Sequence, residues 1–334
     1  MISNRKIYIF AVLLVLVLGA AFILISLQPA KGKTARLVVG GPSDLTMLIA
    51  FAKDRGLFEK YNVEVDLRDL QTGKISQDAL MSGDLDVGII VDTNIAFIGY
   101  QGAPSIKVLA SVQEQHGDGI IARSDHGIKK PSDLLDKTIG YVPATTSHVF
   151  LARYAEKNNL DFNRFKLLAM SPPALQSAIV RGDIDAVSIF QPFRYNAATA
   201  LGGRAIEFTD PSAYTVYALL AVRNDVLKTK RATLTRFLQA LVEAEHIVGS
   251  DQNGAVSSFA REMGVSSGTM HTIWPEYTSR VRFDQGIIAT VRADGQWIRA
   301  TQDGFIAKPM PDYGAYMSPD ILRTIDPNRV SIRQ

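Results

Sequence analysis

The sequence predicts an α/β protein made of two similar lobes, and three observations support this fold class. Residues 175–193 combine one apolar helix face, the helix-ending Gly182, a short acidic turn and an apolar strand. Residues 78–91 repeat the same order, and they align with residues 177–190 without a gap. Segments of strand and helix character also alternate twice along the chain, which is typical of two α/β units.

The first alternating unit begins with the apolar run 36–39, which predicts a strand. A turn at residues 40–44 follows, and Ser43 or Asp44 can cap the helix expected at residues 45–53. The further elements expected here are a strand at residues 63–67, the first repeat helix with its strand up to Val91, a helix after residues 92–94, and a strand at residues 106–109.

The second unit starts at residues 119–123, which predict another strand. Ser171 and the two prolines after it form a strong helix start, which leads into the second repeat. The other elements expected are a short capped helix at 130–137, strands at 138–142, 165–168 and 217–222, and helices at 149–158, 232–248, 255–263 and 287–301, followed by a proline-rich tail.

We expect one lobe to be inserted between two segments of the other. In this prediction residues 34–119 and 217–334 form the first lobe, and residues 120–216 form the second. Ligands of open α/β sheets bind beyond the carboxyl ends of the strands. Those ends carry the loops 40–44, 92–94, 144–147 and 191–192, so the sequence predicts one small-molecule cleft between the lobes.

The composition excludes several classes of function. The net charge is only +3 and no basic arm is present, so we expect no nucleic-acid partner. The chain has no cysteine, which excludes disulfides, thiol catalysis and cysteine-type zinc sites. Its five histidines form no metal-binding pair, and it has no serine-nucleophile or phosphate-loop motif. We therefore expect no enzyme, no catalytic residues, no metal site and no cofactor.

The N-terminal 33 residues are expected to be a membrane anchor or a signal segment with a linker. Residues 7–27 are uncharged and almost wholly apolar, which is long enough to cross a bilayer as a helix. Arg5 and Lys6 precede this segment and should stay in the cytoplasm, so the rest of the chain is exported. A signal cleaved near the small residues 19–21 is the alternative. We favour the anchor, because cleavage there would leave an apolar new terminus.

Residues 144–147 place three hydroxyl side chains between a strand and a helix. The start of a helix offers free N–H groups and a favourable dipole to an anion, and hydroxyls add donors. The same residues can also serve as a helix cap without any ligand. Their position at the predicted cleft favours the anion site.

Together these features resemble the solute-binding proteins of ABC importers, in the group for alkanesulfonates, taurine, nitrate and thiamine precursors. The resemblance covers roughly residues 36–248. It rests on the two Gly-Asp-apolar-Asp segments, on residues 56–60, 130–134 and 145–147, and on the pair Gln191 and Pro192.

This resemblance implies a two-lobed type II periplasmic-binding-protein fold that closes on one small solute. It implies a monomer at the outer face of the cytoplasmic membrane that delivers its solute to an ABC transporter permease. Many relatives have an acidic residue before the proline, whereas this chain has Gln191, which favours an organic anion over a cation. The ligand contacts that it implies are Ser43, Asp44, Asp92, Thr93, Thr145, Thr146, Ser147 and Gln191.

Two alternatives to an anion-specific importer subunit stay open. The retained apolar segment also fits a membrane-tethered receptor for a signalling partner. A heterocycle like a thiamine precursor is the other alternative, because Asp44 and Asp92 can pair with a cation. A related family that makes the thiamine pyrimidine carries a cysteine cluster, which this chain lacks.

If residues 7–27 anchor the chain, carbonate-washed membranes should retain it, and protease added to spheroplasts should degrade it. The physical reason is that an uncharged apolar segment of this length partitions into the bilayer. A soluble product that lacks these residues would instead identify a cleaved signal.

Overall fold

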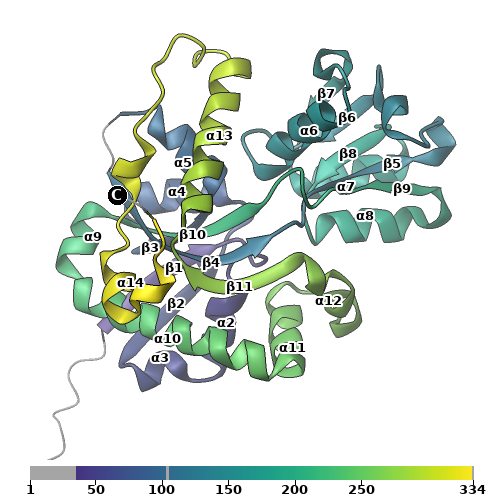
Figure 1. Cartoon of the computed structure of the whole chain (residues 1–334). Helices are drawn as coiled ribbons and strands as arrows, with labels where there is room; N and C mark the ends of the chain where they lie inside the picture. The colour runs from purple at the N-terminus through teal and green to yellow at the C-terminus, as the bar shows by residue number, and fades with distance from the viewer. Residues whose placement is uncertain (1–34, 103–104, 333–334) are drawn as a thin grey trace, which may run out of the picture. The chain divides into compact units, whose positions relative to one another are not determined.

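The computed structural model describes residues 35–102 and 105–332, and these contain two β sheets with helices packed around them (Figure 1). The strands of the six-stranded sheet, in the order in which they lie side by side, are β11 (Tyr277–Arg282), β4 (Ile106–Gln115), β10 (Val216–Arg223), β3 (Val87–Val91), β1 (Ala35–Gly41) and β2 (Val63–Asp69). Those of the five-stranded sheet are β7 (Lys166–Ala169), β6 (Thr138–Tyr141), β8 (Ala186–Ile189), β5 (Gly119–Arg123) and β9 (Ala205–Phe208).

The two sheets repeat one topology. In each, two parallel strands lie beside an antiparallel strand: β1 and β3 beside β10, and β6 and β8 beside β5. The order β2-β1-β3-β10-β4 therefore corresponds to β7-β6-β8-β5-β9. The α/β class with two similar halves, which the repeated helix–turn–strand pattern predicts, is confirmed.

The helices follow the strands closely, and most of their apolar faces are buried. Along the chain they are α2 (Met47–Asp54), α3 (Leu57–Lys60), α4 (Gly73–Ser82), α5 (Asp92–Gly99), α6 (Thr146–Lys157), α7 (Pro172–Arg181), α8 (Phe193–Leu201), α9 (Asn224–Thr229), α10 (Arg231–Ser250), α11 (Gln252–Glu262), α12 (Ser267–Ile273), α13 (Gln285–Thr301) and α14 (Asp320–Ile325). Helices α2 and α3 pack on α10, and α13 packs on α5.

The chain passes between the sheets twice, from β4 to β5 and from β9 to β10. The two crossing segments contact each other, because Nδ1 of His116 lies 3.2 Å from the carbonyl oxygen of Tyr214. One apolar core continues from the six-stranded sheet to one face of the five-stranded sheet, and a smaller core covers the other face. Arg36–Gln334 accordingly form one unit by their contacts, and the division into the lobes 34–119 with 217–334 and 120–216 stays a prediction.

Several elements differ from the expectations. The strand β11 was not predicted, because it lies between the helices expected at 255–263 and 287–301, where no element is expected. It is an edge strand held by β4, so pairing across the sheet determines its conformation rather than local preference. The helix α8 and the strand β9 were also not predicted, whereas the helices α10, α11 and α13 begin and end within a few residues of the expected positions.

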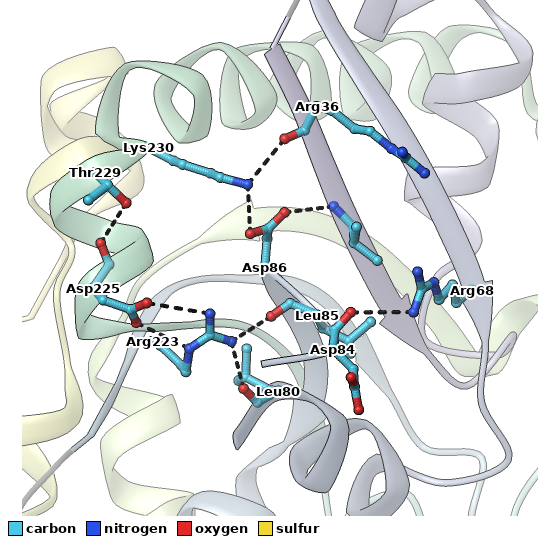
Figure 2. A network of polar contacts seen from close by, with 11 residues as sticks. Arg36, Arg68, Leu80, Asp84, Leu85, Asp86, Arg223, Asp225, Thr229 and Lys230 are labelled. Carbon is cyan, nitrogen blue, oxygen red and sulfur yellow. Dashed lines mark hydrogen bonds and ion pairs between the residues drawn. The ribbon is translucent and has the colours of Figure 1, made fainter. Parts of the chain in front are cut away.

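A carboxylate fixes the start of the parallel strands in the six-stranded sheet. Asp86, the second aspartate of the first repeat, accepts hydrogen bonds from the N–H of Val38 at 2.9 Å and from Lys230 at 2.7 Å (Figure 2). The guanidinium of Arg223 donates to the carbonyl oxygens of Leu80 and Leu85, at the end of the repeat helix (Figure 2). The turn between helix and strand is thus held from both sides.

The same arrangement occurs in the five-stranded sheet. Asp185 accepts from the N–H of Thr138 at 2.8 Å and lies 2.8 Å from Nδ1 of His126. Arg123 donates to the carbonyl oxygens of Ile179 and Val180 at the end of α7. Arg223 and Arg123 both pair with an aspartate two residues later, so the internal repeat extends to the antiparallel strands β10 and β5.

The expected membrane segment lies outside the described residues. Within residues 35–102 and 105–332, no helix combines the length and the apolar character that a bilayer-spanning segment requires. The anchor at residues 7–27 therefore stays a prediction.

Replacing Asp185 with Ala should lower the free energy of unfolding by roughly 1–3 kcal/mol, because the N–H of Thr138 loses its acceptor. Asp183, the first aspartate of the same motif, is the matched control. Among the described residues its carboxylate pairs with Arg181 alone, at an exposed position, so Asp183→Ala should cost less than about 1 kcal/mol. Urea unfolding of both variants would measure the difference, and equal losses would contradict the anchoring role of Asp185.

Candidate ligand-binding site

A cavity lies where the carboxyl ends of strands from both sheets meet. The space between its atoms is about 380 Å³, its open mouth included. The loops after β1, β2, β3, β6 and β8 and the last residue of β4 contribute to it, as expected for open α/β sheets. The residues that line it are Pro42, Asp44, Leu45, Gln71, Thr72, Gly73, Lys74, Val91, Asn94, Gln115, Ala144, Thr145, Thr146 and Phe190.

Two helices begin at the cavity. Helix α4 starts at Gly73, and the hydroxyl oxygen of its cap residue Thr72 accepts from the N–H of Ile75 at 3.2 Å. Helix α6 starts at Thr146 after the cap position Thr145. The first turn of each helix has N–H groups without partners inside the helix, so both starts favour a negatively charged ligand group.

The turn into α6 is sharp. Ala144 takes a left-handed conformation with φ of 56°, which is unfavourable for a residue with a Cβ atom. The hydroxyl of Thr145 donates to the carbonyl oxygen of Val142 at 2.8 Å and lies 3.0 Å from the hydroxyl of Ser147. These bonds hold the loop in the shape that exposes Thr145 and Thr146 to the cavity.

Buried oxygens lie beside the helix starts. Gln115 donates from Nε2 to the carboxylate of Asp44 at 3.3 Å, and Gln113 donates to the carbonyl oxygen of Asp44 at 2.8 Å. The hydroxyl of Thr146 donates to Asp118 at 3.0 Å. Burial raises the pKa of Asp44 and of Asp118 to about 7, so both carboxyls titrate near neutral pH.

Three of the eight predicted ligand contacts line the cavity: Asp44, Thr145 and Thr146. Ser43 is half-buried beside them, and Ser147 is fully buried one layer below, where its carbonyl oxygen accepts from the hydroxyl of Ser188 at 2.8 Å. Neither Ser43 nor Ser147 is among the residues that line the cavity. A ligand contact at either residue stays a prediction.

Asp92 and Thr93 lie in a buried network rather than along the cavity. Asp92 accepts from the N–H of Tyr217 at 2.7 Å and from the hydroxyl of Tyr214. Thr93 donates to Asp294 at 3.2 Å, and Tyr214 lies 3.0 Å from the same carboxylate. Burial raises the pKa of both Asp92 and Asp294, so this pair retains a proton above the usual range of an aspartate. The network joins α5 and α13 to the second crossing segment.

Gln191 is 2% exposed, and its side chain is used within the protein. Its peptide bond to Pro192 is cis. Its amide donates to Glu276 at 3.1 Å and accepts from the N–H of Tyr195 at 3.0 Å, whereas its neighbour Phe190 lines the cavity. A ligand contact at Gln191 likewise stays a prediction.

Sequence reasoning did not single out Lys74 or Gln115. Residues 71–74 carry the same signal as residues 144–147, a hydroxyl at a helix start after a strand, so a consistent use of that signal would have found Lys74. Gln115 shares one face of β4 with Gln113, and two amides at alternating positions of an apolar strand are the only local signal for it.

Residues 45–254 match a family described as NMT1/THI5 like, which covers more than half of the chain. The chain belongs to the NMT1/THI5-like family. This result confirms, at the level of the family, the resemblance to solute-binding proteins that the repeated segments indicate.

Proteins similar to this chain include binding proteins of the periplasm. The taurine-binding periplasmic protein of Escherichia coli (strain K12) is 25% identical over 229 residues, which are 65% of this chain and 68% of that protein. The periplasmic aliphatic sulphonate binding protein SsuA from Escherichia coli has a similar structure, with a TM-score of 0.70 and 18% identity over 84% of this chain and 96% of that one. The periplasmic-binding-protein fold with two sheets is thus confirmed.

An enzyme shares the same fold. The desulfurization enzyme DszB superposes with a TM-score of 0.65 and 14% identity, over 88% of this chain and 100% of that chain. At this identity the likeness concerns the fold alone. The fold alone therefore does not distinguish a binding protein from an enzyme. That distinction has to be argued from the residues that line the cavity.

The buried carboxyls should make the stability of the protein depend on pH. Folding raises the pKa of Asp44 and Asp118 from 3.8 to about 7, so the folded protein holds these protons more tightly than the unfolded chain. The stability that they contribute is present below pH of about 4 and is lost as the pH rises through about 7. Thermal unfolding should therefore occur at a lower temperature at pH of about 8 than at pH of about 5.

Asp44→Asn mimics the neutral acid, so it should remove part of this pH dependence and raise the unfolding temperature at the higher pH. Asp78→Asn removes one negative charge at an exposed position and serves as the control. An unchanged pH profile in Asp44→Asn would contradict the titration of Asp44 in this range.

Proposed function

We propose that the protein captures a small organic anion, such as a sulfonate, a carboxylate or a nitrate-like solute, and delivers it to an ABC importer. The observation that carries this proposal is the pair of helix starts, α4 and α6, at one cavity together with Lys74. Membership in the NMT1/THI5-like family and the relatives that bind taurine and aliphatic sulfonates support it. The same relatives support a periplasmic location.

Lys74 gives the cavity a positive charge. Among the described residues that line it, Lys74 carries the one cationic side chain, and its ammonium now pairs with Asp78 one turn later at 2.5 Å. Both side chains are about half exposed, so the pair contributes little to stability and the ammonium can turn to a ligand at low cost. The anionic group is thus held by Lys74 and by the N–H groups of the helix starts.

Binding without turnover is the second part of the proposal. Catalysis of acyl or group transfer needs a nucleophile and a base within hydrogen-bond reach of each other. The hydroxyl of Thr145 faces a carbonyl oxygen and Ser147, so it has no base beside it. The hydroxyl of Thr146 donates to Asp118, but the second oxygen of that carboxyl has no hydrogen-bond partner among the described residues, so no third group orients it as a base. His148 lies next to this loop, yet burial lowers its pKa to about 4 and its ring packs on Trp297 at 4.8 Å.

A cationic heterocycle is the second candidate ligand, because the carboxyl of Asp44 lines the cavity. A membrane-tethered receptor role depends on residues 7–27, which lie outside the described part of the chain. Neither alternative accounts for the two helix starts and Lys74, so we favour the importer subunit for an anion.

A panel of sulfonates, carboxylates and cationic aminopyrimidines should separate these ligands in thermal-shift and calorimetric titrations of the full chain in mild detergent. The anions should stabilise the protein. Lys74→Gln should weaken their binding about 2- to 5-fold, since a partly exposed charge pair contributes roughly 0.2–1 kcal/mol.

Lys157→Gln is the matched control, because Lys157 is also about half exposed and paired with an aspartate but lies outside the cavity. The Lys157→Gln variant should bind the anions with the same affinity as the unmodified chain. Stabilisation by the cations alone would overturn the proposed ligand class, and a chemically altered ligand recovered at catalytic rates would overturn the binding role.

A further inference from the structure

Four side chains that do not line the cavity form a buried network: Asp92 and Thr93 at the start of α5, Asp294 in α13, and Tyr214 in the second crossing segment. The hydroxyl oxygen of Tyr214 contacts the carboxyls of both aspartates, and it lies 3.0 Å from that of Asp294. The hydroxyl oxygen of Thr93 lies 2.9 Å from that of Tyr214 and 3.2 Å from the carboxyl of Asp294. The network thus contains four contacts between oxygen atoms.

These four contacts require more protons than the two hydroxyls supply. A hydroxyl has one proton to donate, and an ionised carboxyl has none. If both aspartates were ionised, two of the four contacts would place lone pairs against each other in a buried site, which is unfavourable. One additional proton on Asp294 can be donated to Tyr214, whose own proton is then donated to Asp92. The geometry is therefore satisfied by three protons rather than two.

The surroundings of the two carboxyls also favour a neutral acid. Among the described residues, Asp92 accepts from uncharged donors, the hydroxyl of Tyr214 and the N–H of Tyr217. Within the same part of the chain, Oδ1 of Asp294 is buried without a hydrogen-bond partner. A second negative charge in this site would be buried without compensation, and burial accordingly raises the pKa of Asp294 well above its usual range.

Few charged groups face the network from the elements that pack against it. Arg153 of α6 is the one cation among those described, and it donates to the carbonyl oxygen of Ala293 at 2.9 Å. The titratable and charged groups that face the network are Arg153 from α6, Asp118 and His116 from the first crossing segment, Tyr217 from β10, and Tyr313 from the segment after α13.

We propose that one proton retained between Asp92 and Asp294 closes this network and thereby fixes the second crossing segment to α5 and α13. Tyr214 is the positioning residue, because it belongs to that segment and contacts both carboxyls. Its carbonyl oxygen also lies 3.2 Å from Nδ1 of His116, so it contacts the first crossing segment as well. The network therefore acts on both connections between the sheets, and it loosens when the retained proton is lost.

The attachment of the crossing segment should weaken as the pH rises. Folding raises the pKa of the aspartate pair, so the stability that the network contributes is present in the usual range of an aspartate and is lost as the pH rises through the raised pKa. The N–H of Tyr217 donates to Asp92 at 2.7 Å, so its hydrogen exchange reports on the network. In the full chain in mild detergent, the protection of this amide, corrected for the intrinsic exchange rate, should fall at alkaline pH.

Asp294→Asn should keep this protection at alkaline pH, because the amide donates in place of the acid proton and does not titrate. An equal fall of the protection in Asp294→Asn would overturn the role of the retained proton.

The retained proton should also be visible in the infrared spectrum. At pH of about 6, above the usual range of an aspartate pKa, the difference spectrum between the unmodified chain and Asp294→Asn should contain the carbonyl band of a protonated carboxyl. Asp303→Asn is the matched control, because Asp303 is exposed just after the same helix. Its difference spectrum should contain carboxylate bands only. A missing protonated band for Asp294→Asn would overturn the proposal.

Tyr214→Phe tests the attachment itself. The amide of Tyr217 should exchange roughly 5- to 100-fold faster, because the two carboxyls lose the hydroxyl that joins them. The amide of Thr138 in the five-stranded sheet should exchange as before, which shows that the variant is folded. If Tyr214→Phe does not fold, the infrared test of Asp294→Asn still decides the proposal.

Tyr277→Phe is the matched control for Tyr214→Phe. Tyr277 is equally buried, but its hydroxyl has no hydrogen-bond partner among the described residues. Its replacement should leave the exchange of the Tyr217 amide unchanged. Unchanged exchange in Tyr214→Phe would overturn the hold of the network on the crossing segment. Neither measurement involves a solute, so its outcome is separate from that of the proposed function.

Discussion

In both sheets, one backbone N–H group of a parallel strand donates to a side chain because no carbonyl oxygen of a neighbouring strand lies opposite it. Just before β1 begins to pair with β3, and at the first residue of β6, one N–H group donates to the carboxylate of an aspartate, Asp86 in one sheet and Asp185 in the other. A buried N–H group without an acceptor destabilises the fold by about as much as a lost hydrogen bond. These aspartates therefore set where each parallel pair begins, and Arg223 and Arg123 hold the preceding helix ends in place.

The residues that stabilise the sheets in this way lie apart from the residues that line the cavity. The aspartates and arginines lie at the amino ends of the parallel strands, whereas the cavity lies at their carboxyl ends. The loops around the cavity are consequently free to carry groups that do not stabilise the fold, such as the strained Ala144 and the buried Asp44. Natural proteins commonly concentrate such unfavourable local features at functional sites.

The sequence predicts the fold well because each copy of the repeat consists of consecutive residues. The helix, its Gly stop and the buried strand lie within about twenty positions, so the two copies can be recognised by pattern. Arg123 and Arg223 were missed because each lies far along the chain from the turn that it holds. The strand β11 was missed for a related reason, since its partner β4 lies more than one hundred residues earlier.

The candidate site was predicted only in part, for a different physical reason. Strand–loop–helix patterns place Asp44, Thr145 and Thr146 at the cavity, since the carboxyl ends of parallel strands meet at one edge. They do not reveal the direction in which a hydroxyl donates, which depends on a distant acceptor such as Asp118. The same limit applies to Asp92, whose buried partner Asp294 follows about two hundred residues later.

Glu276 joins the two sheets without any ligand. Coming just before β11, it accepts from Gln191 and Arg194, which lie at the start of α8 beside the five-stranded sheet, and Arg194 also donates to the carbonyl oxygens of Gly117 and Asp118 in a crossing segment. A contact that already favours one arrangement of the sheets raises the population of that arrangement before the solute arrives. One arrangement of the two sheets is therefore held partly by a carboxylate that does not line the cavity, and any movement of one sheet relative to the other would have to break its bonds to Gln191 and Arg194.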